Sequence, residues 1–325
     1  MNTIEIGDCR DIMRRWAQQG VKAQMCVTSP PYFGLRDYGH SDQIGLESTP
    51  EEYISTMVEV FRCVRDVLAD DGTLWLNIGD SYAGSGKGPA GNLGKTHNER
   101  EMTHTRNSGL VPEGCKPKDL IGIPWMLAFA LRADGWYLRQ DIIWHKPNPM
   151  PESVRDRCTK AHEYIFLLSK SKKYFYDNEA MKEPATTSER DIKRARITGR
   201  GDQASSANYL GSPQRDKSGG FPQSDPDNPT RNRRSVWTVA TRPYKGAHFA
   251  TFPPALIEPC VLAGSRPDDI VLDPFMGSGT TAQVALKLGR QYIGCELNPD
   301  YAALQNQRIN EVTNSNILPY SVEDN

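Results

Sequence analysis

The tetrapeptide Ser29-Pro30-Pro31-Tyr32 combines residue types that can hold and orient a planar amine. Each proline fixes its own φ angle and removes a backbone N–H, which leaves the carbonyls of Ser29 and Pro30 rigid acceptors. The Ser29 hydroxyl is a further acceptor, and the Tyr32 ring offers a flat face for stacking. A plain Pro-Pro turn at the end of a strand explains the same residues, so the tetrapeptide needs support from other motifs.

These acceptors suit chemistry at an exocyclic amino group, whose lone pair is delocalised into the ring that carries it. Aligned acceptors can turn the amine hydrogens out of the conjugated plane and direct the lone pair toward a methyl donor. Such positioning needs no strong base. The tetrapeptide contains no cysteine that could form a covalent adduct, and nearby Cys26 falls within an apolar run.

A second motif, Asp273-Pro274-Phe275-Met276-Gly277-Ser278-Gly279-Thr280-Thr281, follows an apolar run and opens a segment of helical spacing. Its glycines allow a tight turn and a close approach of the backbone to a ligand. Glu296 follows a second apolar run, 19 residues after Gly277. That offset is typical of a carboxylate that binds ribose hydroxyls, although a tight turn without a ligand is the simpler alternative.

Short apolar runs that alternate with helical segments must position these motifs. Strands are predicted at Thr3–Ile6, Gln24–Val27, Thr73–Ile78, Tyr137–Trp144, Ile270–Leu272 and Tyr292–Cys295. A hairpin is predicted from Glu163–Leu168 and Lys173–Tyr176. Helices are predicted at Asp11–Gln19, Glu51–Leu68, Ile123–Ala133, Thr280–Leu288 and Pro299–Ile309. The alternation predicts an α/β fold with a mainly parallel sheet, whose ligands lie at the carboxyl ends of the strands.

Two polar stretches interrupt this alternation, at residues 83–118 and 184–246. The second is dense in arginine and lysine, whereas the whole chain has a net charge of −1. Composition alone is equally consistent with a solvated insertion and with a basic surface for phosphates. The arginines that we expect to contact phosphates are Arg190, Arg194, Arg196, Arg231, Arg233 and Arg234.

The bulk composition is that of a globular chain, with 38% hydrophobic and 24% charged residues. No apolar run approaches the roughly 20 residues of a membrane span, and the first residues lack the pattern of a signal peptide. The seven cysteines are scattered, and no spacing typical of a metal site occurs. We therefore expect a cytoplasmic protein without a metal centre.

Together, the two motifs and Glu296 resemble the β group of DNA amino-methyltransferases, which includes N4-cytosine enzymes and many N6-adenine enzymes. The resemblance covers most of the chain outside residues 184–246, and the order of the motifs, with the tetrapeptide first, is that of this group. It implies a permuted Rossmann-like, S-adenosylmethionine-dependent methyltransferase sheet with an inserted target-recognition region. The chain ends would then lie between the strand of Glu296 and the strand of Asp8, with Asp8, Glu296 and Ser29 as neighbours.

The resemblance also implies roles for individual residues. The catalytic residues would be Ser29, Pro30, Pro31 and Tyr32. Residues that bind S-adenosylmethionine would be Asp8, Asp273, Pro274, Phe275, Gly277, Ser278, Gly279, Thr280, Thr281, Glu296 and Asn298. Residues 144–148 and 162–164 resemble segments that line the pocket for the target base, and residues 248–254 resemble a helix start beside the methionine end of the cofactor.

The resemblance further implies a domain organisation and a partner. Residues 1–183 and 247–325 would form the catalytic domain, and residues 184–246 the target-recognition region, with 83–118 as an accessory loop facing DNA. The expected partner is double-stranded DNA. A cognate restriction endonuclease is a further candidate partner, which the sequence leaves open together with the oligomeric state.

The first residue of the tetrapeptide bears on the target base. In this family serine accompanies mostly N4-cytosine methylation, whereas aspartate or asparagine accompanies mostly N6-adenine methylation. Ser29 therefore favours N4-cytosine, with N6-adenine as the nearest alternative. A methyltransferase for proteins or small molecules would not need an arginine-rich insertion, and a DNA-binding protein without catalysis would not need both motifs and Glu296.

Overall fold

The computed structural model describes residues 1–34, 43–84, 111–185, 230–241 and 252–315. The chain divides into two compact units, of which the first comprises Met1–Asp177 and Ser235–Asn325. The second unit is Asn178–Arg234. In the described part of the chain, no helix is both long and apolar enough to cross a bilayer.

An eight-stranded sheet forms the centre of the first unit, in the order β1-β10-β9-β2-β3-β5-β4-β8. Its strands are β1 (Asn2–Ile6), β2 (Ala23–Thr28), β3 (Leu68–Ile78), β4 (Tyr137–His145), β5 (His162–Ser169), β8 (Val236–Thr238), β9 (Ile270–Asp273) and β10 (Gln291–Glu296). All strands of this sheet except β5 run in one direction. The predicted α/β fold with a mainly parallel sheet is confirmed.

The predicted hairpin of residues 163–168 and 173–176 is wrong. β5 instead lies between β3 and β4 and pairs antiparallel with both. Its residues from Ile165 to Leu168 are buried, as befits an inner strand. Residues 173–176 form no strand; there, Phe175 donates its N–H to the Asp71 carbonyl, and the Tyr176 ring stacks on Trp75.

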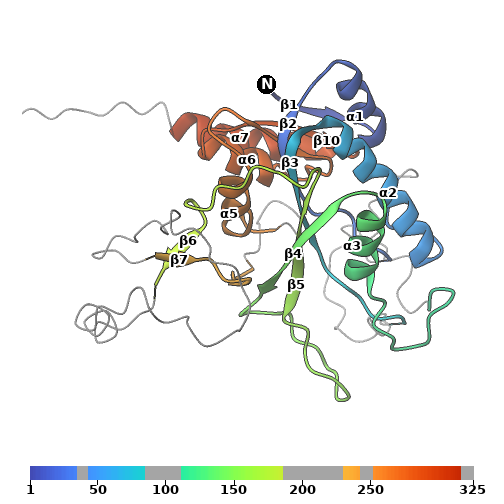
Figure 1. Cartoon of the computed structure of the whole chain (residues 1–325). Helices are drawn as coiled ribbons and strands as arrows, with labels where there is room; N and C mark the ends of the chain where they lie inside the picture. The colour runs from blue at the N-terminus through green and yellow to red at the C-terminus, as the bar shows by residue number, and fades with distance from the viewer. Residues whose placement is uncertain (35–42, 85–110, 186–229, 242–251, 316–325) are drawn as a thin grey trace, which may run out of the picture. The chain divides into compact units, whose positions relative to one another are not determined.

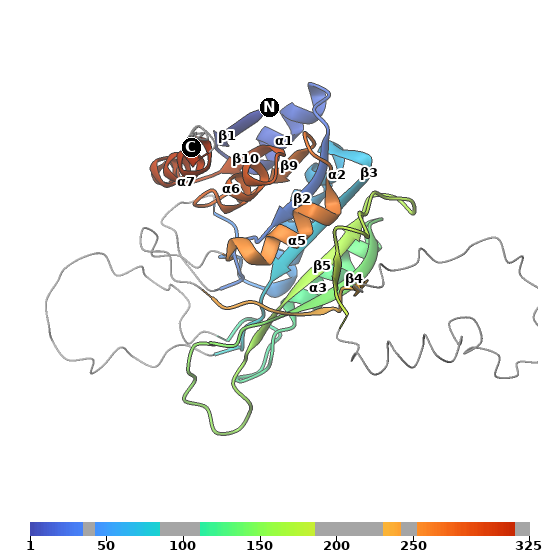
Figure 2. The same ribbon diagram turned by 90° about the vertical axis from the view of Figure 1, so that its left-hand side faces the viewer.

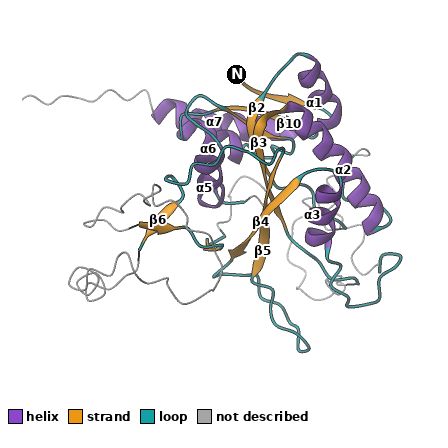
Figure 3. Ribbon diagram, in the orientation of Figure 1, coloured by secondary structure: helices purple, strands orange, loops and turns teal. Residues whose placement is uncertain are grey.

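Helices cover both faces of the sheet. They are α1 (Cys9–Gln18), α2 (Pro50–Val67), α3 (Ile123–Ala133), α5 (Pro254–Gly264), α6 (Thr280–Lys287) and α7 (Ala302–Ser315), the last preceded by a short 3₁₀ turn, η2 (Pro299–Tyr301). Figures 1 and 2 show α1, α2 and α3 on one face and α5, α6 and α7 on the other. Figure 3 shows the same alternation of strands and helices by colour.

Helix α2 illustrates how the sequence builds these layers. Thr49 caps its first turn by accepting from the Glu52 N–H, while the Glu52 side chain accepts from the Thr49 N–H. The apolar stripe predicted for this helix lies in the core, where Tyr53, Met57 and Phe61 are fully buried. The helix is therefore fixed at its start by polar contacts and along its length by packing.

The two ends of the chain meet in the sheet, as expected for the permuted order of the family. β1 pairs in parallel with β10, with Ile6 opposite Glu296. The N–H of Gly7 donates to the Glu296 carbonyl over 2.8 Å. The turns that follow β1 and β10 are therefore adjacent at the carboxyl edge of the sheet.

The second unit is described in part by a two-stranded antiparallel ribbon of β6 (Lys182–Pro184) and β7 (Thr230–Asn232). Glu183 accepts from Arg231 and from Arg234, each over 2.9 Å. One carboxylate thus pairs with two of the arginines that the sequence assigns to phosphate contacts. Residues 236–238 form the edge strand β8 of the first unit, and the division into catalytic and recognition regions stays a prediction.

Candidate active site

The buried carboxylate of Asp273, at the end of β9, holds the glycine loop to the sheet. It accepts hydrogen bonds from the Thr28 hydroxyl (2.6 Å), the Thr281 hydroxyl (2.6 Å) and the Phe275 N–H (3.0 Å). Burial raises the pKa of Asp273 to about 6, against the opposing effect of these three donors. The loop is therefore fixed at both ends, at Phe275 and at the first turn of α6.

Glu296 closes the same loop from β10. One carboxylate oxygen accepts from the Gly277 N–H over 2.8 Å, and the other accepts from the Asn298 N–H over 2.9 Å. Burial raises the pKa of Glu296, while these backbone donors act in the opposite direction. Each oxygen retains a second lone pair, so the carboxylate can still accept from ligand hydroxyls.

Helix α7 supports the loop through residues that the sequence prediction missed. Gln305 donates to the Gly277 carbonyl over 2.7 Å, and Arg308 donates to the Thr280 hydroxyl over 2.6 Å. Gly279 has a φ of 86°, and a Cβ there would lie 3.2 Å from the Gln305 Cα. Both α7 side chains are buried three residues apart on one helix face. The sequence carries no signal for them, because polar residues at this spacing are also typical of a solvent-exposed helix face.

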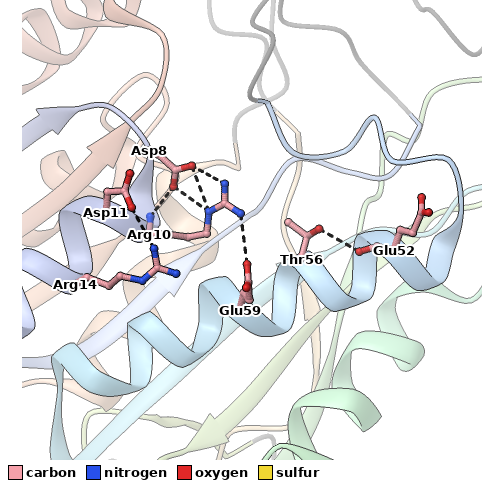
Figure 4. A network of polar contacts seen from close by, with 7 residues as sticks. All are labelled: Asp8, Arg10, Asp11, Arg14, Glu52, Thr56 and Glu59. Atoms are coloured by element: carbon pink, nitrogen blue, oxygen red, sulfur yellow. Dashed lines mark hydrogen bonds and ion pairs between the residues drawn. The ribbon is translucent and has the colours of Figure 1, made fainter.

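Asp8, which the family resemblance places near the cofactor's adenine, is fixed by Arg10. The carboxylate caps α1 by accepting from the Arg10 N–H (2.8 Å), and it also accepts from the Arg10 guanidinium (2.6 Å). These hydrogen bonds hold the pKa of Asp8 below its usual value. Figure 4 shows the guanidinium reaching from Asp8 to Glu59 of α2, so Arg10 joins the two helices.

These residues fit a ligand with ribose hydroxyls and a charged chain. The two carboxylate oxygens of Glu296 lie beside the glycine loop and can accept hydrogen bonds. Asp8 follows β1, the strand next to the strand of Glu296. Among the described residues, the Ser278 hydroxyl within the loop is buried and has no hydrogen-bond partner. A buried hydroxyl without a partner is costly, and this one keeps its full hydrogen-bonding capacity within the loop. The Asn298 side chain instead caps η2 by accepting from the Asp300 N–H.

The tetrapeptide 29–32 follows β2 directly and is held by contacts from neighbouring elements. The buried Tyr53 of α2 donates its hydroxyl to the Pro31 carbonyl over 2.8 Å. The Tyr32 hydroxyl donates to Glu163 of β5 over 2.8 Å. The Pro31 carbonyl is therefore engaged inside the protein.

The two predicted pocket segments, 144–148 and 162–164, meet beside Tyr32. Lys146 forms an ion pair with Glu163, and its ammonium group lies 4.3 Å from the centre of the Trp144 ring. Lys160 donates to the Asp80 carbonyl over 2.6 Å, and burial lowers the pKa of Lys160. Asp80 in turn accepts from the N–H groups of Gly122 and Ile123 at the start of α3.

The comparisons with known proteins agree with this geometry. The DNA methylase family, which covers N6 and N4 enzymes, matches residues 23–307. The chain belongs to this family. It is 49% identical to the Type II methyltransferase M.SmaI of Serratia marcescens, over 94% of this chain and 90% of that protein. It is 47% identical to the Type II methyltransferase M.Cfr9I of Citrobacter freundii, over 94% and 87%.

Solved structures share the fold of this DNA methylase. The PvuII DNA methyltransferase, described as cytosine-N4-specific, superposes with a TM-score of 0.59 at 18% identity, covering 96% of this chain and 90% of that one. TTHA0409 of Thermus thermophilus, a putative DNA modification methylase complexed with S-adenosyl-L-methionine, gives a TM-score of 0.56 at 22% identity, covering 96% and 94%.

One detail of the predicted neighbourhood needs correction. Asp8 and Glu296 follow adjacent strands, as expected, but β9 lies between β10 and β2. Ser29 therefore stands beside the strand of Asp273 rather than that of Glu296. Of the arginines predicted to face DNA, Arg190, Arg194 and Arg196 lie outside the described residues, as do residues 85–110 of the accessory loop and most of segment 248–254.

The raised pKa of Asp273 leads to a prediction for this DNA methylase. The pKa of Asp273 is about 6 in the folded chain, and its ordinary value is 3.8. As the pH falls, Asp273 therefore takes up a proton in the folded chain before it does so in the unfolded chain. It therefore adds stability as the pH falls from about 6 to about 4, and this gain is lost as the pH rises through 6.

We expect the wild type to gain stability relative to Asp273→Asn over that pH range, because asparagine cannot be protonated there. Denaturant unfolding of both proteins at a series of pH values measures the difference. A difference in unfolding free energy that does not change with pH would contradict the buried, ionisable role of Asp273.

Proposed function

We propose that this methyltransferase modifies N4 of cytosine in double-stranded DNA. The observation that carries the proposal is the hydrogen bond between Thr28 and Asp273, which places the tetrapeptide 29–32 beside the glycine loop. Ser29 at the first position favours cytosine. The PvuII enzyme, described as cytosine-N4-specific, supports the same choice through its shared fold. N6-adenine methylation is the second candidate, because it would use the same acceptors on a larger base.

S-adenosylmethionine is the cofactor, and it supplies an electrophilic methyl group on a sulfonium. We assign the loop 273–281 to its binding, with Glu296 accepting from the ribose hydroxyls and Asp8 near the adenine. Pro274, Phe275 and Thr280 complete the loop, and Asn298 supports Glu296 through its backbone N–H. The chain's own contribution is to fix these acceptors before the ligand binds, which lowers the cost of ordering them.

The target base must leave the helix, because an amino group paired inside a duplex cannot line up with a methyl donor. Extrusion costs a few kcal/mol, and stacking on Tyr32 offsets about 1–3 kcal/mol. The Pro30 carbonyl and the Ser29 hydroxyl then accept from the amine and orient its lone pair. The proposal thus needs positioning and electrostatics from these residues rather than a strong base.

Residues 184–246 are the proposed target-recognition region, with 83–118 as an accessory loop, and double-stranded DNA is the proposed partner. The excess of arginine and lysine in this region, within a chain of net charge −1, supports the proposal. A cognate endonuclease is a further proposed partner, since the relatives are Type II methyltransferases. The cytoplasm remains the predicted compartment.

The cofactor assignment predicts the effect of Glu296→Ala. The ribose hydroxyls would lose a charged acceptor, so the affinity for S-adenosylmethionine should fall by roughly 1.5–3 kcal/mol. Calorimetric titration measures this loss. Asp300→Asn, which removes an exposed carboxylate four residues away, is the control and should bind like the wild type. Equal affinities for the Glu296 variant and the wild type would overturn the assignment.

The target base is tested by the modified nucleoside. Methylation of random duplex DNA, followed by nucleoside mass spectrometry, should yield N4-methylcytosine. Ser29→Ala should slow methyl transfer in single-turnover assays. Ser48→Ala, which removes an exposed hydroxyl outside the site, is the control and should not slow it. N6-methyladenine would favour the second candidate, and 5-methylcytosine would contradict direct methylation of an amine.

The recognition region is tested by the salt dependence of DNA binding. Replacement of Arg190, Arg194 and Arg196 by alanine should flatten the plot of log affinity against log salt, by about 0.9 for each phosphate that the variant no longer neutralises. Arg231 and Arg234 share the carboxylate of Glu183, so their removal should flatten it less. The second variant replaces Arg231, Arg233 and Arg234 by alanine. If the slope of log affinity against log salt is unaltered in both triple variants, DNA docks elsewhere.

A further inference from the structure

Glu163, near the start of β5, accepts from the side chains of Tyr32 and Asn77 and pairs with a cation. Its Oε2 accepts from the Tyr32 hydroxyl over 2.8 Å and from the Asn77 amide over 3.4 Å. Its Oε1 pairs with the Lys146 ammonium group. The side chains of Lys146 and Glu163 are 19% and 16% exposed, so the pair is largely removed from water. Its members therefore hold one another in place more firmly than an exposed pair would.

Gly79, directly after β3, leaves room for this arrangement. A Cβ at residue 79 would lie 2.8 Å from Cε2 of Tyr32 and 3.1 Å from Cγ of Glu163. The Tyr32 ring and the Glu163 side chain thus both pack against the backbone of residue 79. The backbone of residue 79 restricts the position of the Tyr32 ring at Cε2, and the Glu163 carboxylate restricts it at the hydroxyl.

The cluster spans four consecutive strands of the sheet. Tyr32 follows β2, Asn77 belongs to β3, Glu163 to β5, and Lys146 follows β4. Asn77 is itself anchored, because its amide also donates to the Tyr164 carbonyl over 3.0 Å. A change in the direction of the Tyr32 ring would therefore break contacts with strands on the other side of β3.

The protonation states agree with these roles. Burial, followed by the nearby charge of Glu163, raises the pKa of Tyr32 well above its usual value. The hydroxyl therefore stays protonated and donates at neutral pH. The Lys146 ammonium group offsets the charge of the Glu163 carboxylate. A carboxylate that is largely removed from water is costly without such a partner.

We propose that Glu163, held by Lys146 and Asn77, is a positioning residue that fixes the ring plane of Tyr32 on which the target base stacks. The inference rests on the proposed function of Tyr32 and extends it. If stacking were all that Tyr32 supplied, phenylalanine would replace it with little loss. The contact with Glu163 makes the hydroxyl matter, because it sets the direction of the ring.

The test is a double-mutant cycle of Tyr32→Phe and Glu163→Gln, with methyl transfer measured in single turnovers on duplex DNA. Each single variant should slow transfer by roughly 10- to 100-fold, the factor for losing a hydrogen bond to a charged group. If Glu163 acts through Tyr32, the double variant should be about as slow as the slower single variant. Losses that multiply would show that Glu163 acts on the base or elsewhere, and would overturn the inference.

Two further measurements separate positioning from general damage. The affinity for S-adenosylmethionine and the melting temperature should stay near the wild-type values in Tyr32→Phe, while kcat falls. Asp269→Asn, which removes a carboxylate paired with Arg266 directly before the amino end of β9, is the control and should transfer methyl groups at the wild-type rate. A Tyr32→Phe enzyme with the wild-type rate would also overturn the inference.

The nucleoside formed by the wild type is identified in the same reactions. If it is N6-methyladenine, the proposed target base fails, yet the cycle still reports whether Glu163 and Tyr32 are coupled. If it is N4-methylcytosine and the losses multiply, the proposed function stands and the positioning role fails. The two conclusions are therefore tested separately.

Discussion

The hydrogen bond between Thr28 and Asp273 is the contact on which the site depends. The two residues are 245 positions apart in the chain, yet each is the last residue of its strand and directly precedes a functional segment. A carboxylate buried at this depth is costly unless several donors reach it, and Thr28, Thr281 and Phe275 supply them. The tetrapeptide and the glycine loop are thus held in a fixed relation to each other.

The other carboxylates of the site are fixed in similar ways before any ligand binds. Asp8 is held by the Arg10 guanidinium, and Glu296 is held by the backbone N–H groups of Gly277 and Asn298. These contacts use only part of the acceptor capacity of each carboxylate. A site prepared in this manner binds its ligand with a smaller loss of conformational entropy.

The reversed direction of β5 brings further chemistry to the same edge of the sheet. In a parallel sheet only the carboxyl ends of strands reach the ligand edge. Because β5 runs antiparallel between β3 and β4, its amino end, with Glu163, lies at that edge instead. This reversal is what lets Glu163 contact both Tyr32 and Lys146, from the neighbouring segments.

The sequence alone determined the local features of this protein. The tetrapeptide 29–32, the glycine loop and the spacing to Glu296 depend on residues close together in the chain, as does the stripe of α2. The order of the motifs, together with the family resemblance, was enough to predict that β1 and β10 are neighbours. Turn chemistry and helical periodicity depend on residues that are near one another in the chain, so they can be predicted without knowledge of the fold.

The tertiary structure decided which other distant residues meet. The place of β5 between β3 and β4, the insertion of β9 between β10 and β2, and the pairing of Glu163 with Tyr32 all followed from strand neighbours. No short-range pattern encodes such neighbours, because a buried apolar strand can pair equally well with several others. Gln305 was missed for the same reason. It supports the glycine loop by donating to the Gly277 carbonyl, and the two residues come together only in the folded sheet.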